Sequence, residues 1–200
     1  MKVYEACYSY IDWDFSNATN LNVDIPLLQT TPPVKMIQQI VYNERALFIY
    51  QRAWESCIRE EVLDRLGEVC EDSCMEFFFA PVHGDNRYFN IEINPAGNVF
   101  LGFGRNRNSL VRLFPKEHFM NLEIHTAKVS GGWEAIYKIP IELIKLFFSE
   151  FELHPGVKMR GNCYKCADLG DARHYLVWNQ LSDGIDDFHS PGDFGSIILK

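Results

Sequence analysis

The chain has 200 residues, a net charge of −8, 47% hydrophobic residues and 14% aromatic residues, which suffices for one domain with a sizeable core. The negative charge argues against general nucleic-acid binding, because such binding needs a basic face that replaces phosphate counterions. No segment approaches the roughly 20 apolar residues of a membrane span, and no basic segment followed by an apolar run marks a signal peptide.

The first third of the chain predicts a hairpin behind a polar lead-in. Residues 1–33 are expected to be an irregular lead-in that ends in two prolines, which exclude helix there. Residues 34–42 and 46–54 alternate apolar and polar positions and predict two strands joined as a hairpin. Residues 58–66 have helical spacing and predict a short helix in the following loop.

The remainder of the chain continues the strand pattern. Residues 139–151, with Pro140 near their start, predict the one convincing helix. The turn at residues 95–98 contains Pro and Gly where a tight reversal requires them. Further strands are expected at residues 74–81, 88–94, 99–104, 122–129, 133–140, 159–168, 174–179 and 194–200.

These elements predict the fold class. About nine or ten strands with frequent turn signals and one or two short helices are typical of an all-β antiparallel sandwich of the jelly-roll or immunoglobulin-like kind. Alternating βαβ units are not indicated. We expect one domain over residues 1–200, with the lead-in at 1–33 and the sandwich at 34–200.

A Cys-x-x-Cys pair, Cys163 and Cys166, raises the question of a zinc or redox centre. The segment reads as a strand, so Cys163 and Lys165 share one face, Tyr164 and Cys166 share the other, and the sulfurs point apart. We therefore expect packed thiols and no metal at this pair. Cys70 and Cys74 could complete a set of four cysteines, but they lie on a different element.

The six cysteines also bear on the compartment. Without an export signal they are read as free thiols of a cytoplasmic protein, because disulfides persist mainly in oxidising compartments. A secreted or periplasmic protein whose leader has already been removed would have the same sequence.

Four stretches together resemble a known family. Residues 71–81 carry Asp-Ser-x-x-Glu, residues 88–105 carry Tyr-Phe-Asn-x-Glu, residues 160–179 hold the cysteine pair, and residues 186–199 close with a Phe-Gly strand. In this order and spacing they resemble carbohydrate-binding family nine-like proteins, which belong with the DOMON-like β-sandwich domains. The resemblance implies a glycan cleft at one sheet face and the end loops, two aromatic rings that sandwich a terminal sugar, and structural calcium.

The resemblance also implies site residues. Glu76 falls on the glutamate position of one site strand, Glu92 falls on the polar position of the next strand, and Phe188 falls on one of the two aromatic positions. The other aromatic is expected just before residue 71, where residues 66–70 contain none. The expected carbohydrate-binding residues are Glu76, Glu92, Arg105, Lys165, Trp178, Phe188 and His189.

The function predicted is that of a non-catalytic carbohydrate-binding module-like protein, which recognises a plant-type glycan such as xylan, or a sugar end, in an end cleft. An interaction domain that has lost sugar binding, a glycoside-active enzyme using Glu76 and Glu92, and a haem-binding DOMON-like domain are the alternatives. The expected partner is an oligosaccharide or polysaccharide, neither nucleic acid nor membrane is expected, and the oligomeric state stays open. No cofactor is expected apart from the calcium that the resemblance implies.

Overall fold

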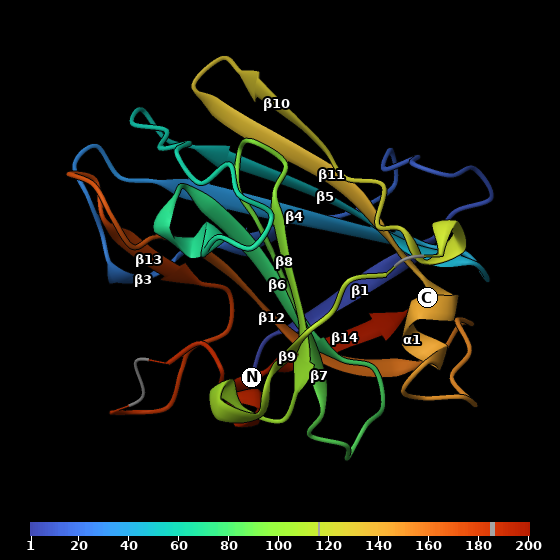
Figure 1. Cartoon of the computed structure of the whole chain (residues 1–200). Helices are drawn as coiled ribbons and strands as arrows, with labels where there is room; N and C mark the ends of the chain where they lie inside the picture. The colour runs from blue at the N-terminus through green and yellow to red at the C-terminus, as the bar shows by residue number, and fades with distance from the viewer. Residues whose placement is uncertain (116, 185–186) are drawn as a thin grey trace.

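The computed structural model describes residues 1–115, 117–184 and 187–200. Its strands follow one continuous hydrogen-bonded path, which curls over into two packed layers (Figure 1). Within these described residues, the regular structure is all β apart from one α-helix of five residues and four short 3-10 helices. The all-β sandwich expected from the sequence is therefore confirmed.

The first layer is antiparallel and is built from two hairpins. The hairpin predicted at residues 34–54 is present, with β4 paired to β5. The strands predicted at residues 122–129 and 133–140 also pair as a hairpin, β10 with β11. In spatial order the layer contains β10 (His125–Val129), β11 (Gly132–Pro140), β5 (Ala46–Trp54) and β4 (Lys35–Tyr42), with β2 (Leu21–Val23) on the outer edge of β4.

The second layer is longer. In spatial order it contains β14 (Gly195–Leu199), β12 (Lys158–Ala167), β6 (Cys74–Ala80), β7 (Tyr88–Ile93), β8 (Val99–Gly104) and β9 (Val111–Arg112). At one end of β12 the layer is extended by β13 (His174–Val177) and then β3 (Ile25–Leu28). The helices are η1 (Val69–Glu71), η2 (Arg107–Ser109), η3 (His118–Met120), α1 (Ile141–Lys145) and η4 (Pro191–Asp193).

The expectation of an irregular lead-in at residues 1–33 is wrong, because β1 (Val3–Tyr8), β2 and β3 lie within it. β1 joins the two layers, since it runs parallel to β14 and parallel to β4. Its side chains Tyr4 and Ala6 are buried in the core, and the Tyr4 hydroxyl accepts a hydrogen bond of 3.0 Å from the backbone N–H of Ile40. Burial at this seam stabilises a strand whose six residues give a weak local signal.

The helix expected at residues 58–66 is also absent, and a buried carboxylate explains why. Asp72 is fully buried, and its carboxylate accepts hydrogen bonds from the backbone N–H groups of Glu61 and Val62 and from the Arg59 guanidinium. These bonds replace the helical ones and hold the segment extended. The helix expected at residues 139–151 shortens to α1, because β11 continues through Pro140 and the chain after Lys145 turns to pack Phe147 against Phe103. No helix among the described residues is long and apolar enough to span a membrane.

The main core lies between the two layers. On β6, Phe77 and Phe79 point into it, whereas Phe78 belongs to a separate cluster on the opposite, outer face of the second layer. The same alternation sends Leu176 and Trp178 into the main core. The outer face of the second layer is thus left to Glu76, Phe78 and their neighbours, and loops cover part of it.

Candidate functional site

A cleft of about 490 Å³ lies on the outer face of the second layer. Its floor comes from β6, β7 and β12, and β3 and β13, at the left of Figure 1, form one wall. The lining residues are Leu27, Leu28, Cys70, Glu76, Glu92, Arg107, Cys166, Asp168, Arg173, Tyr175, Phe188 and His189.

Two carboxyl groups face each other on the floor of this cleft. The antiparallel register pairs Glu76 of β6 directly with Glu92 of β7, and both side chains are buried. Burial raises the pKa of Glu92 to about 7, and burial together with the charge of Glu92 raises the pKa of Glu76 well above its usual value. Near neutral pH the pair therefore retains a proton, so it can both donate and accept hydrogen bonds.

Neighbouring polar groups fix the orientation of these carboxyls. The Asn90 amide donates a hydrogen bond of 2.9 Å to Oε1 of Glu92. The thiol of Cys166 donates one of 3.0 Å to Oε1 of Glu76. These two hydrogen bonds use only Oε1 of each carboxyl, and both side chains line the cleft.

Two aromatic rings meet at an angle in the wall of the cleft. Phe188 and Tyr175 have ring centroids 6.2 Å apart and ring planes 79° apart. One face of Phe188 is covered by the buried ring of Tyr164, stacked at 4.2 Å with an angle of 10°, and the Tyr164 hydroxyl donates to the backbone oxygen of Phe188. The Arg173 guanidinium donates a hydrogen bond of 3.0 Å to the Tyr175 hydroxyl. The rings thus form a fixed corner instead of two parallel plates.

A cation and a neutral histidine complete the rim. Arg107 donates to the Asp187 carboxylate at 2.8 Å, and its positive charge acts on both buried carboxyls of the floor. Burial and the nearby Arg107 lower the pKa of His189 to about 4, so its ring is neutral at pH 7. His189 Nδ1 lies 2.8 Å from the Tyr88 hydroxyl.

The structure brings together four of the seven residues expected from the sequence, namely Glu76, Glu92, Phe188 and His189. Arg105 does not line the cleft and lies exposed just after β8. Trp178 is packed in the main core, so close to Gly195 that a Cβ there would lie 2.5 Å from the indole. It therefore offers no ring to a ligand.

Lys165 is also absent from the cleft. Alternation correctly places it opposite Tyr164 and Cys166, but its face points into the protein, where its Nζ lies 3.2 Å from Oε1 of Glu55 and 2.9 Å from Nε2 of His174. Both charged partners are fully buried. The ion pair connects β12 with the chain segment just after β5, so Lys165 ties the two layers together.

Sequence reasoning missed several residues of the cleft. Arg107, two positions after the expected Arg105, faces the carboxyls, and Tyr175 supplies the second ring. The alternation in residues 174–179, which places Tyr175 opposite Leu176 and Trp178, was the available signal. Leu27 and Leu28 come from the segment expected to be irregular, so nothing local indicated them.

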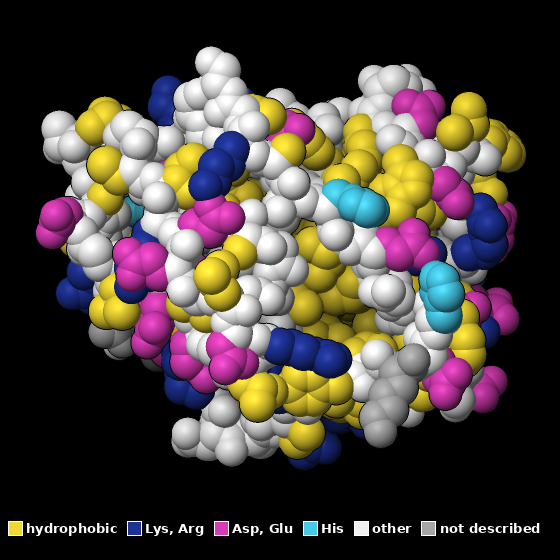
Figure 2. All heavy atoms as spheres, turned by 45° about the horizontal axis from the view of Figure 1, so that its top comes forward, with side chains coloured by type: hydrophobic (Ala, Val, Ile, Leu, Met, Phe, Trp, Pro, Cys, Tyr) yellow, Lys and Arg dark blue, Asp and Glu magenta, His cyan; other side chains and the backbone are white. Residues whose placement is uncertain are grey.

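A second hollow, of about 280 Å³, lies beside β8, residues 113–115 and residues 121–124. Figure 2 shows hydrophobic side chains at its base. Its described lining residues include Arg65 and Phe114 but no carboxylate. It therefore lacks the paired acids and is the weaker candidate for binding a polar ligand.

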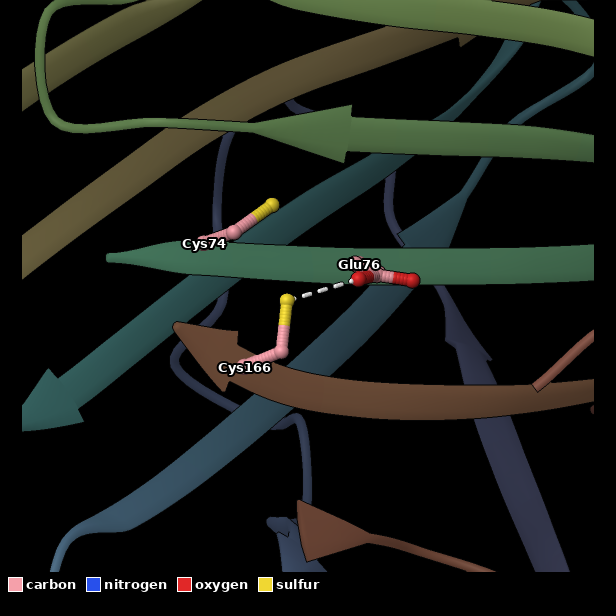
Figure 3. Close-up of side chains that lie close together, drawn as sticks. All are labelled: Cys74, Glu76 and Cys166. Atoms are coloured by element: carbon pink, nitrogen blue, oxygen red, sulfur yellow. Dashed lines mark hydrogen bonds between the residues drawn. The ribbon is translucent and has the colours of Figure 1, made fainter. Parts of the chain in front are cut away.

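One group of potential metal ligands exists within residues 1–115, 117–184 and 187–200: Cys74, Glu76 and Cys166, whose donor atoms all lie within 4.8 Å of one another. In Figure 3 the Cys166 side chain reaches from β12 toward Glu76 on β6, and Cys74 lies on the same strand as Glu76. Calcium takes six to eight oxygen ligands, so a set with two thiols does not suit the structural calcium that the resemblance implies.

Residues 16–199 match the family model described as carbohydrate-binding family 9. A proposed carbohydrate-binding protein from Bacteroides uniformis ATCC 8492 superposes with a TM-score of 0.82 at 22% identity, over 100% of this chain and 99% of that chain.

Two further similar structures are family 9 carbohydrate-binding modules from Caldicellulosiruptor kristjanssonii. The complex with cellotriose has a TM-score of 0.72 at 11% identity, over 100% of this chain and 94% of that chain. The complex with glucose has a TM-score of 0.71 at 12% identity, over 100% and 96%. At these identities the likeness shows a common fold. None of the curated proteins matches the sequence.

Proposed function

The chain belongs to carbohydrate-binding family 9, and from this we propose that it binds the end of an oligosaccharide in the cleft on the outer face of its second layer, without catalysis. The observation that carries the proposal is the combination of an aromatic corner and a pair of buried, cross-strand carboxyl groups in one cleft. A pyranose has an apolar face that packs on a ring and a rim of hydroxyls that requires directional donors and acceptors.

The roles of the side chains follow from their surroundings. Phe188 is held by the Tyr164 stack, so its ring can serve as a platform without losing much conformational entropy on binding. Glu76 and Glu92 can satisfy hydroxyls as donor and acceptor, and Arg107 supplies further N–H donors at the rim.

The similar structures suggest which ligands to test first. The Caldicellulosiruptor kristjanssonii modules are complexes with cellotriose and with glucose. We therefore propose a glucose-type end, or a plant-type glycan such as xylan, as the ligand class. The cleft of about 490 Å³ has the volume of an ordinary small-molecule site, which suits a short sugar segment.

Titration calorimetry with glucose, cellotriose and xylotriose tests the proposal. We expect a 1:1 heat for at least one sugar, and we expect Phe188→Ala and Tyr175→Ala to weaken its binding about tenfold each, as loss of a ring contact worth roughly 1.4 kcal/mol implies. Phe114→Ala, which removes a ring from the second hollow, is the matched control and should bind normally.

The outcomes separate this proposal from its alternatives. Flat titrations with folded wild-type protein would favour an interaction domain without sugar binding. Normal affinity in Phe188→Ala and Tyr175→Ala would overturn the cleft as the site. After long incubation with the protein, we expect the sugar to be recovered chemically unchanged. If the wild type instead cleaves the sugar, and Glu76→Gln or Glu92→Gln abolishes that cleavage, the protein is an enzyme.

A further inference from the structure

We propose that Cys74, Glu76 and Cys166 form a binding site for a thiophilic divalent cation of the zinc type. This inference rests on different observations from those behind sugar binding, although both involve Glu76. It starts from the convergence of two thiols and one carboxyl, whose donor atoms all lie within 4.8 Å of one another (Figure 3). Thiolates and carboxylates are established zinc ligands, and thiolates favour zinc, cadmium and other soft cations over calcium and magnesium.

The β-sheet register preforms this donor set. Cys166 of β12 is paired directly with Cys74 of β6, and Glu76 lies two residues further along β6, on the same face. The Cys166 Sγ is already 3.0 Å from Oε1 of Glu76. Zinc–ligand bonds of about 2.0–2.3 Å place tetrahedral donors roughly 3.3–3.8 Å apart, so side-chain rotations on fixed strands suffice to close the set.

The pairing that matters runs across strands and not along the chain. The sequence draws attention to Cys163 and Cys166, but Cys163 packs in the main core while Cys166 packs with Cys74 on the outer face. Two cysteines three positions apart on a strand point to opposite faces of the sheet, so they cannot bind the same cation. Two cysteines directly opposite each other on neighbouring strands point to the same face and can bind one cation together.

The cleft gives a cation access to this site and offers it a fourth ligand. Glu76 and Cys166 line the cleft, and so does Cys70, which packs against Cys74 and Cys166. A cation can therefore enter through the cleft and take Cys70 or a water molecule as its fourth ligand. Two thiolates, one carboxylate and a divalent cation leave a net charge of −1, and the positive charge of Arg107 acts on Glu76 and offsets it.

Cadmium titration of the reduced and metal-stripped 200-residue protein tests the proposal. We expect a sulfur-to-cadmium charge-transfer band that saturates at one cadmium per chain. Cys74→Ser and Cys166→Ser should each reduce the band by about half and weaken cadmium binding at least tenfold. Cys57→Ser, which changes an exposed cysteine outside the cleft, should titrate like the wild type.

A second control and a second method guard against effects of unfolding. Cys163→Ser makes the same buried change on the opposite face of β12, and it should keep the band. X-ray absorption of the zinc-loaded wild type requires no variant, and we expect sulfur ligands at about 2.3 Å. A zinc shell of nitrogen and oxygen only, or a wild-type band that persists in the Cys74→Ser/Cys166→Ser double variant, would overturn the proposal. These metal titrations contain no sugar, so their outcome does not depend on whether the protein binds sugar.

Discussion

Replacing Glu92 by glutamine should remove much of the pH dependence of the protein's stability. The glutamine is nearly isosteric, and its side-chain oxygen can still accept the hydrogen bond from Asn90. The pKa of Glu92 is raised by burial from 4.5 to about 7 in the folded protein. Between these two values the folded state holds a proton that the unfolded state has lost. The contribution of Glu92 to the free energy of unfolding is therefore fully present below pH 4.5, and it is lost as the pH rises to about 7.

The size of the effect follows from the two pKa values. Their difference of about 2.5, at about 1.36 kcal/mol per pKa unit, corresponds to about 3 kcal/mol of unfolding free energy. Glu76, whose pKa is also raised by burial, adds to the loss of stability with rising pH in the wild type. In Glu92→Gln the contribution of Glu76 to the loss of stability also becomes smaller, because the charge of Glu92 no longer raises the pKa of Glu76.

Urea unfolding at pH 5 and pH 8, with EDTA present, provides the measurement. Between these pH values we expect wild-type stability to fall by about 2.5 kcal/mol from Glu92 alone, with a further loss from Glu76, and we expect Glu92→Gln to lose much less. Glu142→Gln, an exposed change on α1, should behave like the wild type. Parallel pH curves for wild type and Glu92→Gln would show that the buried carboxyl pair does not govern this titration.

Three further changes test the assignment of residues to the core. Lys165→Ala leaves Glu55 buried without its cation, so the unfolding free energy should fall by about 3–5 kcal/mol. The sugar affinity of the folded fraction should stay normal, and a selective loss of sugar affinity would show that Lys165 belongs to the binding site. Trp178→Ala should lose about 3–5 kcal/mol in urea unfolding, and a loss below 1 kcal/mol would contradict its burial. Gly195→Ala places a Cβ 2.5 Å from the Trp178 indole, so thermal unfolding should reveal a cost of about 1–3 kcal/mol, and an unchanged midpoint would refute this close contact.

Local patterns predicted the strands well wherever alternation was strong. The hairpin at residues 35–54 and the strand at 88–93 follow from side chains that face alternately the core and the outer surface, and the strand at 74–80 follows from its short apolar run. The helix expected at residues 58–66 failed because Asp72, ten residues away in the chain, takes the backbone N–H groups of Val62 and its neighbour. Such a long-range capture of backbone donors has no local signature.

The site was partly predictable for the same reason. Alternation separated the two faces of β12 correctly, but it could not decide which face pointed inward, and so Lys165 was placed in the site instead of the core. The resemblance located Glu76 and Glu92, and the structure adds that they are direct cross-strand partners. Tyr175 and Leu28 reach the cleft through the pairing of β13 with β3, which unites segments almost 150 positions apart.

The seam strand β1 has a consequence for synthesis on the ribosome. Tyr8 pairs with Tyr42, so β1 can dock on the first hairpin soon after that hairpin emerges. Its other edge pairs Val3 with Ser196 and Ala6 with Leu199, and closing so long a loop is entropically costly and slow. The nascent chain therefore carries an open strand edge until β14 is translated, and chaperone occupancy should concentrate on that interval.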